Sequence, residues 1–186
     1  MLGWPFVGMP LMVLLGFGAR DATFGFGARE GTVPIGPWSP HSQGPALQWL
    51  QSFTDPRTAT ALLIAAAGAA LYRRLWALLP LIMVVPLVSV GATENLQRFF
   101  AGLAGQGAAA YPSSPTTLMV VGLGLLVLAV GVRRWLIVAA GLFVLLGVAG
   151  QSVDVRYFTD SLGALLLGTS LVAVTAVILR RLGLRL

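Results

Sequence analysis

Charged residues occur at only a few points of this chain, and the stretches between them are apolar and long enough to cross a membrane. All twelve basic residues are arginines. Seven of them form three clusters: Arg73 and Arg74; Arg133 and Arg134; Arg180, Arg181 and Arg185. The six acids, Asp21, Glu30, Asp55, Glu94, Asp154 and Asp160, lie in the alternate gaps. Because an excess of arginine in short loops marks the cytoplasmic side, this pattern predicts a polytopic membrane protein with its arginine clusters in the cytoplasm.

The composition supports the same class of protein. The chain is 57% hydrophobic and only 10% charged, whereas a soluble domain carries roughly 25% charged residues. The net charge of +6 is explained by this topology and by contact with anionic lipid headgroups, so we expect membrane lipids and no nucleic acid as partners. The absence of cysteine excludes disulfides and thiolate chemistry.

The apolar stretches define six candidate spans, since a membrane helix needs about 20 mostly apolar residues. They cover approximately residues 2–18, 57–72, 75–93, 116–132, 135–153 and 161–179. We read the first as a retained span, because no basic region or cleavage site marks it as a signal peptide. The predicted fold is a single all-α membrane domain over 1–186, a bundle of six transmembrane helices with both termini cytoplasmic. The arginine-rich, lysine-free composition suggests a bacterial inner membrane.

Three longer segments, 19–56, 94–115 and 154–160, are expected on the non-cytoplasmic side. In the first, Leu47, Trp49, Leu50 and Phe53 predict either a short surface helix or a loop that caps the bundle. The single histidine, His41, lies in this segment and is interpreted as a solvated loop residue. We expect no metal site and no cofactor.

Polar residues gather on all three outer segments, where a lipid headgroup would lie. Glu94 and Arg98 have the i, i+4 spacing of a helical ion pair. Ser114 before Pro115 is typical of a helix N-cap, and the start of that helix offers either simple capping or anion binding. Asp160 or Thr159 is a natural cap for the last span, and Arg156 either pairs with an acid or meets an anion. The candidate headgroup-binding residues are Gln97, Arg98, Ser113, Ser114, Arg156 and Asp160.

The order and spacing of these clusters resemble the type 2 phosphatidic acid phosphatases, a family of membrane lipid phosphatases. The family's first motif is K-x6-R-P, and Thr93-Glu-Asn-Leu-Gln-Arg98 is similar to its lead-in. The second, P-S-G-H after an aromatic residue, corresponds to Tyr111-Pro-Ser-Ser-Pro115. The third, S-R-x5-H-x3-D, ends in an aspartate that corresponds to Asp160. The resemblance covers about residues 50 to 168 and implies a six-helix membrane fold.

The residues that carry the family's chemistry are replaced here. Gln97 stands at the position of the lysine, Pro115 at one histidine and Arg156 at the other. In the family, one histidine attacks phosphorus, the second protonates the leaving group, and basic residues hold the phosphate. With no lysine and one histidine outside every motif, this chain is expected to be a non-catalytic relative.

We therefore expect an accessory or scaffold subunit of a membrane complex, or a protein that binds a lipid or isoprenoid phosphate in the former pocket. Two alternatives remain open: a lipid phosphatase with altered catalytic residues, in which Asp160 or His41 is recruited, and a small unrelated transporter. Glycine-rich helix faces, such as those with Gly124, Gly141 and Gly163, permit close helix packing. They would serve contacts within the bundle or contacts with other subunits.

Overall fold

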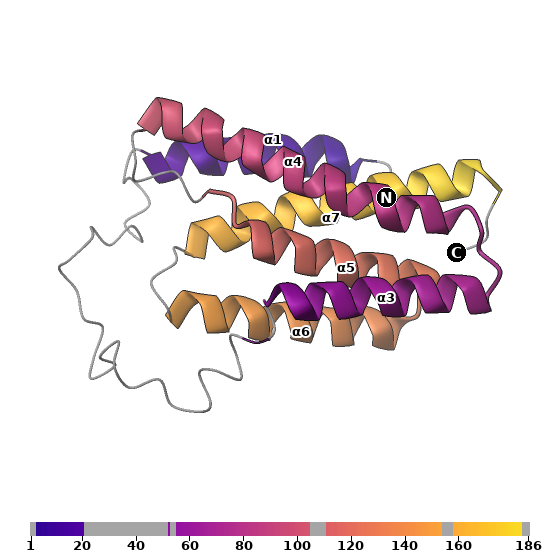
Figure 1. The fold of residues 1–186 in the computed structure, drawn as a ribbon. Coiled ribbons are helices and arrows are strands. Elements are labelled where there is room, and N and C mark those ends of the chain that lie inside the picture. Colours follow the sequence, from indigo (N-terminus) through magenta and orange to yellow (C-terminus); the bar gives the residue numbers. More distant parts are fainter. Residues whose placement is uncertain (1–2, 21–51, 53–54, 105–110, 154–157, 184–186) are drawn as a thin grey trace.

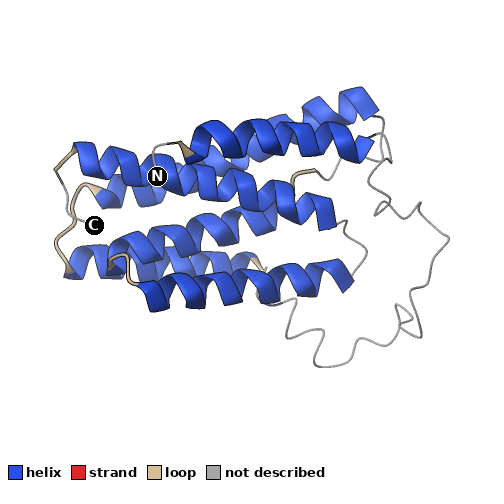
Figure 2. Ribbon diagram, turned by 180° about the vertical axis from the view of Figure 1, so that it is seen from behind, coloured by secondary structure: helices blue, strands red, loops and turns tan. Residues whose placement is uncertain are grey.

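The structure is a computed structural model, and it describes residues 3–20, 52, 55–104, 111–153 and 158–183. These residues form six helices and no strand, arranged along one common direction as a bundle (Figures 1 and 2). The helices are α1 (Trp4–Arg20), α3 (Pro56–Tyr72), α4 (Leu78–Ala104), α5 (Ser114–Val130), α6 (Arg134–Val153) and α7 (Phe158–Arg181). The all-α fold class is confirmed. The short helix expected near Trp49 lies outside the described residues.

Each predicted span coincides with one helix, and the largest difference is in α4. This helix continues to Ala104, whereas the predicted span ends at residue 93. The extension is held by aromatic packing, because the Phe100 ring lies 5.9 Å from that of Phe17 on α1 and 5.1 Å from that of Tyr111. The segment expected as an outer loop over 94–115 therefore begins as helix.

Two of the helices are long and apolar enough to cross a membrane. They are α4, over Leu78–Phe100, and α7, over Asp160–Arg181. Helices α1, α5 and α6 contain shorter apolar stretches. By length and composition, membrane association is therefore indicated by two helices of the part of the chain that the structure describes.

Helix α5 occupies the centre of the bundle and contacts α3, α4, α6 and α7. Glycine makes its contact with α7 close. A Cβ atom built at Gly168 would lie 2.8 Å from Cγ1 of Val120, and one at Gly124 would collide with the side chain of Val172. Two buried clusters fill the interior: Val121, Leu125 and Leu179 belong to the larger one. The predicted role of glycine in helix packing is thus confirmed at these positions.

The described arginines of the three clusters, Arg73, Arg74, Arg133, Arg134, Arg180 and Arg181, lie at one end of the bundle, which we call the arginine end. It is formed by the α3–α4 turn, the α5–α6 turn and the end of α7 (Figure 1). Arg73 Nη1 donates to the carbonyl oxygen of Ala129 at 3.0 Å and so joins the first two of these elements. The opposite end holds Asp55 before α3, Glu94 near the end of α4 and Asp160 at the start of α7; we call it the polar end.

Helix α1 lies beside α7 but is shifted toward the polar end. Trp4 Nε1, at its start, donates to Thr169 Oγ1 in the middle of α7 at 3.2 Å. Further along, the Met12 carbonyl oxygen accepts a hydrogen bond from the Tyr111 hydroxyl at 2.6 Å. Pro10 lies inside the helix, so the predicted first helix continues through this proline. The first predicted span is helical, but its start is level with the middle of α7.

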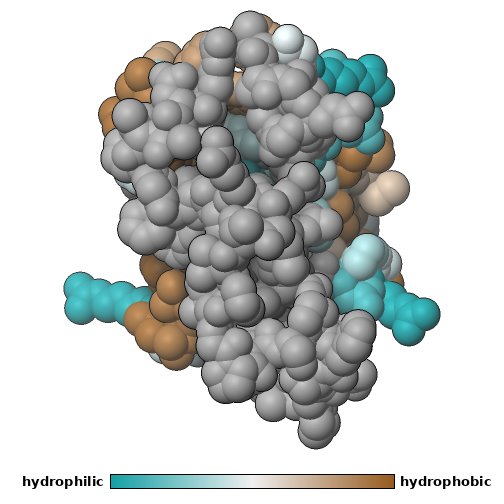
Figure 3. All heavy atoms as spheres, turned by 90° about the vertical axis from the view of Figure 1, so that its left-hand side faces the viewer, coloured by the Kyte–Doolittle hydropathy of each residue, from teal (hydrophilic) through white to brown (hydrophobic). Residues whose placement is uncertain are grey.

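Large apolar side chains reach the outer surface of several helices. Met83 and Leu87 on α4 are each 71% exposed, and hydrophobic residues reach the outline of the bundle when it is viewed toward the polar end (Figure 3). Others are Phe6, Leu14, Ile64, Ile137, Val138, Leu142 and Leu145. Soluble monomers rarely expose contiguous apolar surface of this kind, so this surface favours a covering of lipid or of other protein.

Candidate functional site

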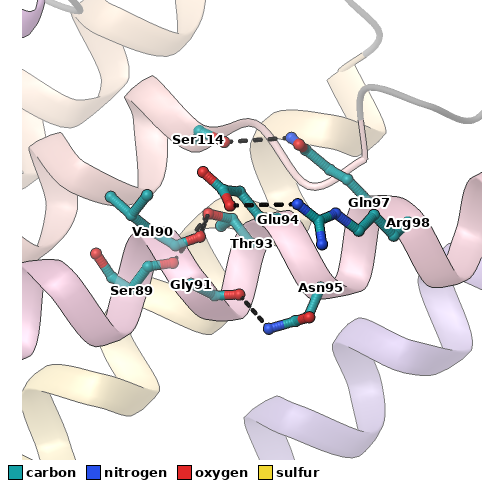
Figure 4. Close-up of polar contacts among 9 residues, drawn as sticks. All are labelled: Ser89, Val90, Gly91, Thr93, Glu94, Asn95, Gln97, Arg98 and Ser114. Carbon is teal, nitrogen blue, oxygen red and sulfur yellow. Dashed lines mark hydrogen bonds and ion pairs between the residues drawn. The ribbon is translucent and has the colours of Figure 1, made fainter.

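The polar end brings together residues that the sequence places on three separate segments. Gln97 on α4 is the link to α5. Its Nε2 donates to the carbonyl oxygen of Pro112 at 2.9 Å and to Ser114 Oγ at 3.2 Å (Figure 4). Because both acceptors belong to the segment that opens α5, this single side chain ties the end of α4 to the start of α5.

A polar stripe on α4 leads to Gln97 from the middle of the helix. Ser89 and Thr93 are fully buried, and they precede Gln97 at spacings of four, on the same helix face. Ser89 Oγ donates to the carbonyl oxygen of Pro86 at 2.7 Å, and Thr93 Oγ1 donates to that of Ser89 at 2.9 Å. Figure 4 shows both side chains on α4. Both hydroxyls therefore bond within their own helix, and Gln97 is the member of the stripe that reaches another element.

Ser113 connects the start of α5 to the start of α7. Its backbone amide donates to the carbonyl oxygen of Asp160 at 3.3 Å. Helix α7 begins at Phe158, so Asp160 lies inside its first turn and is not the cap that the sequence predicted; it is only 5% exposed. A carboxylate in the first turn of a helix is stabilised by the positive end of the helix dipole. The predicted neighbours Ser113 and Asp160 are thus placed together.

The N-cap of α5 lies one residue before the position expected from the sequence. Ser113, with φ −67° and ψ 114°, is the extended cap residue, and Ser114 is already helical. The Ser113 hydroxyl makes no capping hydrogen bond to the first amides of the helix. Instead, its carbonyl oxygen accepts from Thr117 Oγ1 at 2.9 Å, and its hydroxyl oxygen accepts from Thr116 Oγ1 at 3.2 Å.

Tyr111 is a member of this cluster that the list of candidate residues omitted. Its ring is 3% exposed and lies against α7, where a Cβ built at Gly163 would be 2.6 Å from three of its atoms. Burial, together with the nearby Asp160 carboxylate, raises the pKa of the Tyr111 hydroxyl above its ordinary value. The sequence contained one signal for a role of Tyr111: it is the lone aromatic residue after a long run of small residues, and Pro112 follows it.

Arg98 does not join the cluster. Its guanidinium is directed at Glu94 on the same helix, with Nη2 3.9 Å from Oε2 (Figure 4). The side chains of Arg98 and Glu94 are 80% and 55% exposed, so solvent screens the pair and it adds little stability. The predicted i, i+4 ion pair is confirmed. Arg156, the other candidate cation, lies outside the described residues, as do His41 and Asp154.

The arrangement is therefore a polar junction between α1, α4, α5 and α7. Its hydrogen-bonding groups are hydroxyls, an amide, a buried carboxylate and backbone carbonyls. In the part of the chain that the structure describes, no three side chains from His, Asp or Glu approach one another as metal ligands would. Comparison with protein-family models, with curated proteins and with solved structures finds no significant match. The resemblance to lipid phosphatases stays a prediction.

Proposed function

We propose that this chain is a non-catalytic integral membrane protein that acts as a scaffold or accessory subunit in a membrane complex. In this proposal six membrane helices form the domain, the arginine end with the end of α7 faces the cytoplasm, and the polar end faces the opposite side of a bacterial inner membrane. Helix α1 enters from the cytoplasmic side and starts level with the middle of α7. Two helices of spanning length and the common direction of all six support this placement.

The observation that carries the proposal is the apolar outer surface between the two ends. Residues such as Met83, Leu87 and Leu145 are exposed on helices whose opposite faces form the buried core. Burial of apolar area in lipid or against another membrane subunit is worth about 25 cal/mol per Å². Covering this surface with lipid or protein is therefore expected to stabilise the bundle.

The polar end supports the non-catalytic part of the proposal. Gln97 and Pro115 stand where the resemblance would require lysine and histidine, and Gln97 is engaged by Pro112 and Ser114. Arg98, the nearest described cation, pairs with Glu94 at the surface. These contacts join helices to one another, which is what a scaffold requires, and they supply neither a nucleophilic histidine nor a general acid.

The topology is testable because the chain has no cysteine. Arg57→Cys and Tyr72→Cys place single thiols near the two ends of α3, at exposed positions. In spheroplasts, a membrane-impermeant maleimide is expected to label Arg57→Cys directly and Tyr72→Cys only after permeabilisation. Equal labelling of the two thiols before permeabilisation, or the reverse order, would contradict the proposed orientation.

Catalysis is tested separately with purified protein. We expect no phosphate release from phosphatidic acid or isoprenyl diphosphate above the level of a mock purification. Activity that disappears in both His41→Ala and Asp160→Asn would instead establish the altered phosphatase. Activity that persists unchanged in both variants would identify a contaminant.

The convergence of Gln97, Ser113 and Ser114 at the start of α5 favours a second candidate function, the binding of a lipid or isoprenoid phosphate at the polar end. Hydroxyl and amide donors beside the start of a helix are suited to a phosphate group. Mass spectrometry of lipids that co-purify with the protein tests this candidate. An enriched phospholipid or polyprenyl phosphate that is lost in Ser114→Ala would support it, and unchanged enrichment in that variant would exclude this site.

A further inference from the structure

A groove separates α6 from α7. It has a volume of about 1040 Å³ and is walled by α5, α6 and α7, with the start of α1 at one end. This volume is at the upper end of the range of roughly 300–1,000 Å³ typical of ligand pockets. Helix α6 contacts α5 but barely touches α7, and this separation leaves the groove between them.

The walls of the groove are lined mostly by apolar residues, many of them small. On α6 they consist of Ile137, Ala140, Gly141 and Val144, which share one face of the helix at spacings of three and four. Gly141 stands in the middle of this face, and a Cβ atom built there would meet nothing within 4 Å. The glycine therefore leaves space in the groove and does not serve a close helix contact.

The two ends of the groove differ in chemistry. Arg180 and Arg181 line it at the arginine end, while Trp4 and Thr169, joined by their hydrogen bond, line it in the middle of the bundle. Along α7 the lining runs from Leu165 to Arg181, sixteen residues apart, which corresponds to about 24 Å of helix. One leaflet of the hydrocarbon core is about 15 Å thick, half of the usual 30 Å. The groove therefore begins with its cations at the headgroup level and is deep enough to hold the full length of an acyl chain from that leaflet.

We propose that this groove binds one anionic phospholipid from the leaflet at the arginine end. Its acyl chains lie along the apolar faces of α6 and α7, and its phosphate is held by Arg180 and Arg181. Guanidinium groups bind phosphate oxygens in a bidentate manner. The proposal rests on the membrane placement proposed above and concerns a site distinct from the polar junction.

The charge requirement is tested by comparing two lipids with the same acyl chains. Purified protein is exchanged into detergent that contains either phosphatidylglycerol or phosphatidylcholine, and bound lipid is measured by native mass spectrometry. Wild-type protein is expected to retain phosphatidylglycerol preferentially. The double substitution Arg180→Gln with Arg181→Gln is expected to lower its affinity about thirty-fold, from the usual contribution of a basic residue at an anionic surface, counted twice. Arg133→Gln with Arg134→Gln is the matched control and should change little.

The position of the lipid is tested by filling the groove. Gly141→Leu adds a side chain to the middle of the α6 wall, and we expect it to lower phosphatidylglycerol retention several-fold. Gly68→Leu on α3 is the control, since it is also exposed, has nothing within 4 Å of its Cβ and lies outside the groove. Equal retention in these two variants would overturn the proposal.

The groove variants could bind less lipid because they misfold, so a further measurement uses the wild-type groove. Phosphatidylglycerol with brominated acyl chains should quench Trp4 fluorescence, and Trp4→Phe should lose that component of the quenching. Equal retention of the two lipids by wild-type protein, or quenching that is the same with and without Trp4, would refute the lipid site. In either case the maleimide labelling of α3 still reports on the membrane topology independently.

Discussion

The polar junction and the groove are built from similar helices but pack in opposite ways. At the junction, Gly163 admits the Tyr111 ring so closely that a Cβ atom there would be 2.6 Å from it. In the groove, Gly141 faces open space. Small residues therefore bring helices together only where a large side chain from a neighbour fills the space they leave, and elsewhere they leave room for a ligand.

The largest expected effect comes from placing the same substitution at these two glycines. Gly163→Leu forces a side chain into the Tyr111 ring, and overpacking of this kind costs typically about 1–3 kcal/mol and at times more. Gly141→Leu meets no neighbour and replaces a helical glycine, which is worth up to about 1 kcal/mol in favour of the helix. Thermal unfolding in phospholipid-free detergent, followed by circular dichroism, should show a lower midpoint for Gly163→Leu and an unchanged or higher one for Gly141→Leu. Equal midpoints would show that the two regions do not differ in packing.

The next effect concerns the hydrogen bond that joins the junction to α1. Tyr111→Phe removes the donor to the Met12 carbonyl oxygen but keeps the ring between Phe100 and Gly163. We expect a loss of about 1 kcal/mol in the free energy of unfolding, the usual net value of one hydrogen bond. Tyr72→Phe is the control, because Tyr72 is 91% exposed. A loss of the same size in both variants would mean that the buried hydroxyl contributes nothing specific.

The same tyrosine gives the junction a pH dependence that the groove lacks. Burial and the Asp160 carboxylate raise the pKa of Tyr111 in the folded state above its unfolded value of 10.0. Above pH 10 the unfolded chain therefore releases this proton more readily than the folded protein, and stability falls as pH rises. Unfolding free energies measured from pH 8 to 11 should fall more steeply for wild-type protein than for Tyr111→Phe. Parallel profiles would show that Tyr111 is not shifted.

Much of the helical frame could be predicted, because apolar length and arginine position are properties of the sequence itself. The extension of α4 could not, since it depends on Phe100 meeting Phe17 and Tyr111, which come from other helices. The difference in packing between Gly141 and Gly163 could not be predicted from the sequence either. Both are glycines in apolar helices, and only the neighbour across the interface distinguishes an open wall from a tight contact.

The candidate site could be predicted only in part, because the direction of a side chain around its helix depends on the neighbouring helices. Gln97 and Arg98 are adjacent, so they project about 100° apart around α4, and the sequence alone does not state which one faces α5. The structure turns Gln97 toward Pro112 and Ser114 and leaves Arg98 at the surface with Glu94. The i, i+4 run Ser89, Thr93 and Gln97 was the available signal, because its members share one helix face with the buried side of α4.

This pair of neighbours provides the smallest and most discriminating test of the junction. Gln97→Ala removes both hydrogen bonds to the start of α5. We expect the free energy of unfolding to fall by about 1 kcal/mol, because the former acceptors can form other hydrogen bonds. Arg98→Gln breaks an exposed ion pair, which is worth about 0–1 kcal/mol and is screened by salt. Denaturant unfolding at low and high salt should therefore show a salt-independent loss for Gln97→Ala and a smaller loss for Arg98→Gln that vanishes at high salt. If Arg98→Gln proved the more destabilising at high salt, the cation would have to act inside the junction. That result would favour a headgroup site at the polar end that includes Arg98.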